Sequence, residues 1–209
     1  MMAVRRIAAL AALVLAISGC ASGTSLTERW RDPSWNSAPM GRVFVVAVRR
    51  DAVRRRMWED AFVNALKERG VTATPSYSQF PDAAPDTQQV IGVVGSGSYD
   101  GVVVSMRLPN QQEEREVPAT VTRVPVTGRN PFTGMYYTVY RDVYQPGYVE
   151  TDEVRLIQTD VWTAKEGGRL VWSGTIRSYD PIDGGLVKDV VDKKVLPQAS
   201  KDGIFPQAP

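Results

Sequence analysis

The sequence contains no histidine and only one cysteine, Cys20, among its 209 residues. Without histidine, Ser-His-Asp and Cys-His catalytic sites are excluded, and so are zinc sites built from His and Cys. A single cysteine also excludes a disulfide within the chain. The chemistry that stays open uses carboxylates, lysine, a serine–lysine pair, tyrosine or a cation held by oxygen ligands. These residues form no recognisable catalytic motif, so we expect no enzyme activity, no cofactor and no metal site.

A strong excess of charge is also absent. The chain has 25 basic and 23 acidic side chains, and two of the basic ones, Arg5 and Arg6, precede Cys20. Basic and acidic residues are therefore equal in number from Cys20 onward. Because binding to nucleic acid needs a basic surface, we expect no nucleic-acid partner.

The longest apolar run, residues 7–17, is too short for a membrane-spanning helix, which needs about 20 apolar residues. It follows the charges of Arg5 and Arg6 and precedes the small residues around Cys20. This order is typical of a secretory signal peptide. The alternative to a lipidated cysteine is an ordinary signal peptide with a chance cysteine near its end.

The tetrapeptide Ile17-Ser18-Gly19-Cys20 resembles the lipobox of bacterial lipoproteins. The resemblance implies cleavage before Cys20 and lipidation of its sulfur, and two or more acyl chains anchor a protein stably. Ala21 stands where an aspartate would imply retention in the inner membrane, so the resemblance implies the outer membrane and a domain facing the periplasm. We expect a signal peptide over 1–19, a lipidated N-terminus and spacer over 20–39, and a single periplasmic α/β domain over 40–209. Within the spacer, residues 27–35 are expected to lie along the domain and the earlier part to be loose.

The first half of that domain alternates strands and helices. Strands are predicted at 42–48, from 71 and at 101–108, and helices at 51–70, with Asp51 as N-cap, and from Asp86. Arg54, Arg55 and Arg56 are interpreted as a solvated helix face that pairs with Glu59 and Asp60. Gly95, Gly97 and Gly101 lie between a helix and a strand, so they are interpreted as turn residues rather than a phosphate loop.

A long β-ribbon is predicted as an insertion at about 109–153. Val and Thr alternate with other residues on both sides of a turn at Gly134, and prolines recur at positions suited to edges and bends. Five tyrosines gather in its second half, and they are expected either to cover cross-strand neighbours or to contact a partner: Tyr136, Tyr137, Tyr140, Tyr144 and Tyr148.

The remaining chain predicts a β-hairpin over 154–180 and a C-terminal helix that Pro197 bends or ends. Trp162 and Trp172 are expected to pack near one another in the hairpin. The predicted fold class is α/β: a βαβαβ start, a long β-ribbon excursion, a β-hairpin and a C-terminal helix, forming one mixed sheet with packed helices.

The lipobox and several phrases, among them RWRDPSW, DAFVNALKERGVTATPSY, GVVVSMRL and DVWTAKEGGRLVWSGT, are similar to a family of uncharacterised bacterial lipoproteins related to the DUF4136 type. The likeness spans most of the chain after the signal peptide. Its motifs are structural, so the resemblance implies no active site.

Three functional hypotheses remain at this point. The first is a lipid-anchored structural or protein-interaction module whose ribbon meets another envelope protein. The second is a periplasmic binder of small ligands or cell-wall fragments, with Arg49, Arg50, Asp51 and residues 110–112 at the carboxyl ends of the strands. The third, an enzyme with carboxylates Glu113, Glu114 and Glu116, has the least support, because adjacent acids in a polar run are normally solvated.

Overall fold

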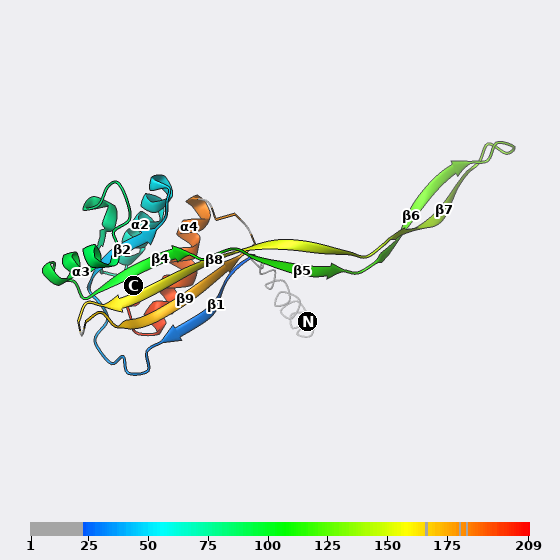
Figure 1. Ribbon diagram of the computed structural model, residues 1–209. Helices are drawn as coiled ribbons and strands as arrows, with labels where there is room; N and C mark the ends of the chain where they lie inside the picture. Colours follow the sequence, from blue (N-terminus) through cyan, green and yellow to red (C-terminus); the bar gives the residue numbers. More distant parts are fainter. Residues whose placement is uncertain (1–22, 166, 180, 183) are drawn as a thin grey trace, which may run out of the picture.

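The computed structural model describes residues 23–165, 167–179, 181–182 and 184–209. Cys20 and the predicted signal peptide lie outside the described residues, and so does the start of the predicted spacer. Figure 1 shows an α/β body from which a long two-stranded ribbon projects.

A mixed sheet forms the centre of the body. Its strands are β1 (Thr24–Arg31), β2 (Arg42–Val48), β3 (Thr72–Pro75), β4 (Gly101–Arg107), β8 (Tyr148–Thr163) and β9 (Leu170–Ser178). Their spatial order is β1-β9-β8-β4-β2-β3, and β2 runs parallel to both β3 and β4, while the other neighbours are antiparallel. The predicted β-hairpin is the pair β8 and β9.

Helices cover one face of this sheet and part of the other. They are α2 (Ala52–Lys67), the short η1 (Ser76–Ser78), α3 (Thr87–Ser96), α4 (Gly184–Val190), the π-helical η2 (Val191–Val195) and α5 (Leu196–Lys201). The main core lies between the sheet and α2 with the C-terminal helices, and it includes Phe62, Trp172 and Leu196. A smaller cluster, with Phe44 and Val94, lies under α3 on the opposite face. The predicted fold class, one mixed sheet with packed helices, is confirmed.

The spacer predicted over 20–39 is in part a strand. Thr24–Arg31 forms the edge strand β1 and pairs antiparallel with β9. Trp35 is buried in the main core, and its backbone N–H donates to the carbonyl of Asp32 at 3.1 Å. The prediction that the early part is loose is therefore wrong for these residues, because the free edge of β9 offers them backbone hydrogen bonds.

The C-terminal helical segment continues past Pro197. The π-helical turn η2 stands immediately before α5, and Pro197 occupies the first turn of α5. Proline lacks an N–H and clashes with the carbonyl four residues earlier in a regular α-helix, so a wider turn before it accommodates the ring. Val190, Val191 and Val195 still face the core.

The two hairpin tryptophans do not pack together. Trp172 is fully buried in the main core, whereas Trp162 is 37% exposed and pairs with Val102 of β4 on the face that carries α3. Successive residues of a strand point to opposite faces, and it is Val161 that lies opposite Trp172. In this register the two tryptophans lie on opposite faces of the sheet, so the prediction that they pack together is wrong.

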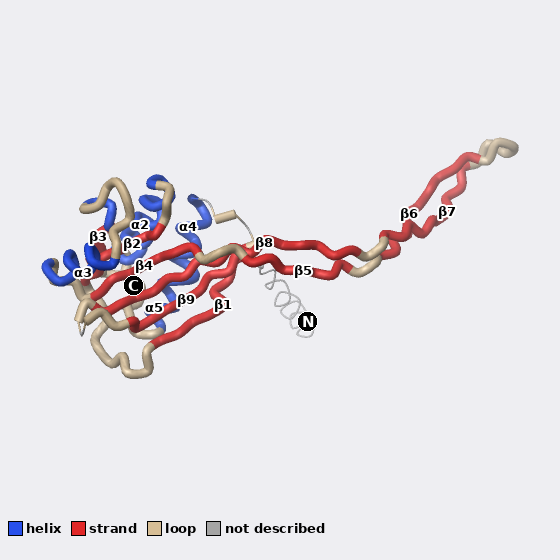
Figure 2. Tube along the Cα trace, in the orientation of Figure 1, coloured by secondary structure: helices blue, strands red, loops and turns tan. Residues whose placement is uncertain are grey.

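Figure 2 shows the helices beside the strands of the sheet. The face that carries α3 is partly polar beyond β4, at Asp160 of β8. Asp160 is buried there and accepts hydrogen bonds from Ser173 Oγ at 2.6 Å and from Gln158 Nε2 at 2.9 Å. The α3 cluster takes its strand residues from β2 and β4, so the sheet is covered on one face and only in part on the other.

Candidate interaction surface

The predicted ribbon consists of two successive antiparallel ladders. At its base, β5 (Gln111–Val117) pairs with the outer half of β8. Farther out, β6 (Thr120–Arg129) pairs with β7 (Tyr136–Gln145). Every residue of β7 is exposed, and all of β6 except Gly128 is exposed as well. Both faces of the outer ladder therefore lie open to solvent.

Prolines and a glycine separate the two ladders. Pro118 and Ala119 interrupt one side, and Pro146 and Gly147 interrupt the other. A Cβ on Gly147 would lie only 2.9 Å from the carbonyl oxygen of Val117, so the backbones approach more closely than any other residue permits. The ribbon bends at this point between its two ladders, as Figure 1 shows.

The five tyrosines do not form one surface. In the register of the outer ladder, Tyr136, Tyr140 and Tyr144 point to one face, where they lie opposite Arg129, Pro125 and Val121. Tyr137 points to the other face, and Tyr148 belongs to the base ladder, opposite Val117. The structure thus brings three of the predicted contact residues together and separates two.

The two faces of the outer ladder differ in chemistry. The face with the three tyrosines also carries the ion pair Arg123–Asp142, at 2.9 Å. The opposite face carries Tyr137 and four exposed valines, listed here: Val124, Val126, Val139 and Val143. The sequence pattern predicted the alternation, but it did not predict that both faces would stay exposed.

The base of the ribbon is held to the body by charged contacts. Glu113 forms an ion pair with Arg177 of β9 and accepts a hydrogen bond from the Tyr179 hydroxyl at 2.9 Å. Arg115 pairs with Glu150 and Asp152 across the ladder. An open cavity of about 470 Å³ lies between these groups.

The three candidate carboxylates are not gathered in one place. Glu113 pairs with Asp152 in the ladder and points to the opposite face from Glu114 and Glu116. The charge of Glu113 is taken up by Arg177. The three carboxylates therefore do not lie on one face of the ladder.

The predicted ligand site at the carboxyl ends of the strands is occupied by the protein's own contacts. The Arg49 guanidinium donates to the carbonyls of Val48 and Ser105 and lies 4.8 Å from the centre of the Trp58 ring. Burial, with the nearby charge of Arg107, lowers the pKa of Arg49 to about 10.

Of the other predicted members of this site, Arg50 is exposed, whereas Asp51 and Asn110 form hydrogen bonds. Asp51 caps α2 by accepting from the backbone N–H of Arg54, as predicted, and Asn110 donates to Glu153. Gln111 and Gln112 belong to β5. A smaller cavity, of about 160 Å³, lies at the opposite edge of the sheet between Met40, Asp100 and Arg169.

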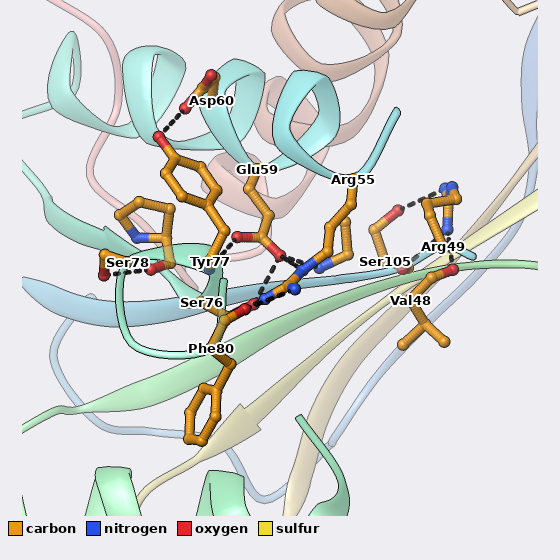
Figure 3. A network of polar contacts seen from close by, with 12 residues as sticks. Val48, Arg49, Arg55, Glu59, Asp60, Ser76, Tyr77, Ser78, Phe80 and Ser105 are labelled. Atoms are coloured by element: carbon orange, nitrogen blue, oxygen red, sulfur yellow. Dashed lines mark hydrogen bonds and ion pairs between the residues drawn. The ribbon is translucent and has the colours of Figure 1, made fainter. Parts of the chain in front are cut away.

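A buried polar network lies beside the carboxyl end of β2 (Figure 3). Glu59 has no exposed surface, and its Oε1 accepts hydrogen bonds from Arg55 Nε at 3.0 Å and Ser76 Oγ at 2.6 Å. Oε1 also accepts from the backbone N–H of Ala47, and Oε2 accepts from that of Tyr77.

Arg55 completes the network. Its Nη1 donates to the carbonyl of Phe80 at 2.7 Å, and its Nη2 donates to Ser76 Oγ at 2.8 Å. The prediction of a solvated face is therefore wrong for Arg55, which is 2% exposed, although Arg54 and Arg56 are exposed. The i,i+4 spacing of Arg55 and Glu59 predicts their ion pair. It does not predict that residues 76–80 bury this pair.

Tyr77 lies at the edge of the same network. Its hydroxyl donates to Asp60 at 2.6 Å, and this hydrogen bond, with partial burial and the charge of the carboxylate, raises the pKa of Tyr77 to about 12. All the strong donors and acceptors of this cluster have partners, so it serves to fix α2 against β2 and η1.

Metal-binding clusters and membrane-spanning helices are both missing from the described part of the chain. Among the described residues, no group of three or more His, Cys, Asp or Glu side chains is placed to hold a metal ion. Within the same part of the chain, none of the helices has the length and apolar content needed to cross a bilayer.

No family model matches the chain, and no curated protein matches it. Several solved structures are similar. The PelC dodecamer from Paraburkholderia phytofirmans is 9% identical, with a TM-score of 0.46, over 88% of this chain and 99% of that chain. A variant PelC dodecamer from the same organism is 10% identical, with a TM-score of 0.40, over 82% and 96%. A PDZ domain protein from Parabacteroides distasonis is 9% identical, with a TM-score of 0.40, over 84% of this chain and 35% of that chain. Similarities at this level support no argument about function.

Proposed function

We propose that the protein is a lipid-anchored module of the bacterial envelope that binds another envelope protein through the outer ladder of its ribbon, β6 and β7. In this proposal Cys20 carries the lipid, the anchor holds the chain to the outer membrane, and the body faces the periplasm. The lipobox supports the anchoring. The module has no catalytic role, no cofactor and no nucleic-acid partner.

The observation that carries the proposal is the exposure of both faces of a two-stranded ladder. An isolated two-stranded hairpin is marginally stable in water, because it has no third element against which to bury side chains. β6 and β7 nevertheless present exposed tyrosines on one face and exposed valines on the other. A partner that covers either face would supply the missing packing.

The tyrosine face is the proposed contact. Tyr136, Tyr140 and Tyr144 are 76%, 68% and 66% exposed, and they lie four residues apart along one face. Tyrosine offers a large rigid surface with a polar end, and it is enriched at the energetically important centres of interfaces. The Arg123–Asp142 pair stands between two of these rings and adds polar specificity.

The test is in-cell photo-cross-linking at single positions of the outer ladder. A photoreactive residue at Tyr140 or Tyr144 is expected to capture one specific protein, whereas the same residue at exposed Ile91 of α3 captures none. A ribbon-shortened variant, with residues 112–153 replaced by Asn-Gly, removes the proposed contact and is expected to lose that partner. Equal capture from Ile91 and Tyr140, or no capture from either tyrosine, would contradict the proposal.

The anchor has its own test. Labelling with a radioactive fatty acid is expected to mark the wild type and not Cys20→Ala, and Cys20→Ala is expected to leave the membrane fraction. A Cys20→Ala protein that stays with the outer membrane would remove the lipid anchor from the proposal without affecting the ribbon.

A further inference from the structure

The end of the ribbon is a turn whose shape is set by Asn130 and Gly134. The Asn130 Oδ1 accepts from the backbone N–H groups of Phe132 at 2.9 Å and Thr133 at 3.2 Å, and the N–H of Gly134 donates to the carbonyl of Asn130 at 2.9 Å. Gly134 has a φ of 70°, a conformation that favours glycine. The side chains of Phe132 and Met135 take no part in these hydrogen bonds.

Large apolar side chains nevertheless stand at this turn. Phe132 is 95% exposed and Met135 is 70% exposed. Turns are normally built from small and polar residues, for which water is a good environment. The turn is also the convex end of a thin arm, so the remainder of the described chain cannot cover it (Figure 1).

The charged side chains near this turn are all basic. Arg129 stands at the last pair of the ladder, where its Nε donates to the carbonyl of Gly134 at 3.1 Å and its guanidinium lies 6.0 Å from the centre of the Tyr136 ring. It forms no ion pair with any described residue. The sequence from Val117 to Arg141 contains no acidic residue.

We infer that this turn, residues 129–137, inserts into the headgroup region of an anionic phospholipid bilayer. Phe132 and Met135 enter the boundary between headgroups and acyl chains, where apolar side chains leave water. Tyr136 lies at headgroup level, the position that amphipathic rings prefer. Arg129 supplies the charge that binds lipid phosphate.

The distribution of charge along the ribbon determines which end of it approaches an anionic bilayer. The base ladder carries six acidic residues and a single basic one within 111–117 and 148–154: Glu113, Glu114, Glu116, Glu150, Asp152 and Glu153, with Arg115. An anionic surface repels this half and attracts the outer half, so the arm meets the bilayer end-on. Since the outer ladder alone spans roughly 30 Å, the acidic base stays outside the headgroup layer.

This inference concerns the turn and does not depend on a protein partner for the tyrosine face. A pocket in another protein is the competing occupant of an exposed phenylalanine. A bilayer fits the observations better, because a convex apolar end with the cation Arg129 behind it matches a fluid anionic surface.

The experiment uses the chain from Ala21 onward, which holds every described element and has neither an acyl chain nor a cysteine. It is mixed with vesicles of phosphatidylcholine and phosphatidylglycerol, or of phosphatidylcholine alone, and sedimented. The wild type is expected to bind the anionic vesicles and to lose binding as salt is raised. In a Phe132→Cys variant labelled with an environment-sensitive fluorophore, the emission is expected to shift to the blue on binding. The same label on Ile91→Cys is expected to show no shift.

Substitutions separate the apolar and electrostatic parts. Phe132→Ser combined with Met135→Ser is expected to weaken vesicle binding at least tenfold. Arg129→Gln weakens binding to anionic vesicles about fivefold. Ile91→Ser, which removes an exposed apolar side chain from the body, is the matched control and leaves binding unchanged.

The inference is overturned if the wild type binds neither kind of vesicle, or if the double serine variant binds as well as the wild type. Absent vesicle binding together with in-cell cross-links from position 132 to a protein would identify the competing occupant. Neither result bears on the proposed protein contact at Tyr140 and Tyr144, because that contact is tested at other positions.

Discussion

At the scale of single residues, the body depends on a charge that is completely removed from water. Glu59 receives four hydrogen bonds, from three different segments of the chain, and its partner Arg55 is 2% exposed. Burying an ion pair is costly, so the network adds less to stability than to geometry. It specifies how α2, β2 and η1 meet.

Glu59→Gln is expected to lower the free energy of unfolding by about 3–5 kcal/mol, because it leaves the buried charge of Arg55 without compensation. Urea unfolding followed by circular dichroism measures the change. Glu68→Gln, at the exposed end of the same helix, is the control, with an expected change below about 0.5 kcal/mol. Similar values for the two variants would mean that the network is not a strong constraint.

At the scale of elements, the two ladders of the ribbon are not continuous. Between them lies a short unpaired segment at Pro118, Ala119, Pro146 and Gly147, where the two backbones approach closely. Only a residue without a side chain fits at Gly147, because the groups closest to an added Cβ are backbone atoms of Val117 and Ala119. Pro118 and Pro146 lie in this segment and withhold backbone donors there. The outer ladder is therefore held in position by a few contacts.

Gly147→Ala is expected to force these backbones apart and to open the neighbouring pairs Val117–Tyr148 and Thr120–Gln145. Amide hydrogen exchange in β6 and β7 should then become at least tenfold faster, while exchange in β2, β4 and β9 stays the same. Gly92→Ala on α3, where an added Cβ meets nothing within 4 Å, is the control. Unchanged exchange in the ribbon would show that this unpaired segment tolerates a methyl group.

Sequence patterns predicted most of these elements, and the exceptions share a cause. The βαβαβ start, the cap at Asp51, the ribbon with its turn at Gly134 and the C-terminal helix follow from local periodicity and turn residues. Three features depend on a partner distant in the sequence: β1 on the edge of β9, the burial of Arg55 under residues 76–80, and the separation of Trp162 from Trp172 by a one-residue difference in register. In the ribbon, the tyrosines were recognised, but their division between faces needed the register of β6 against β7.

At the scale of the whole molecule, the body and the ribbon use different means of stabilisation. Neither hydrophobic cluster contains a residue between positions 108 and 153. The last buried strand residue before the ribbon is Ser105 of β4, and the first after it is Val154 of β8. The body therefore owes its core to the remainder of the chain.

Replacing residues 112–153 by Asn-Gly is expected to change the free energy of unfolding by less than about 1 kcal/mol. The new two-residue turn joins Gln111 to Val154, which already lie opposite each other in the ladder. Thermal unfolding measures the effect, and a shift within about 4 °C is expected. A much larger fall would mean that Glu113 and its contacts to Arg177 and Tyr179 support the body.

The single strand β8 has a mechanical consequence. Its outer half is one of the two strands at the base of the ribbon. Its inner half lies in the middle of the sheet, hydrogen-bonded to β4 on one side and β9 on the other. Tension applied at the far end of the ribbon passes into β8 and, through β5, into β4. It therefore loads the β8–β9 and β2–β4 ladders in shear, with many hydrogen bonds sharing the force at once. An arm attached to an edge strand would instead be peeled away one bond at a time.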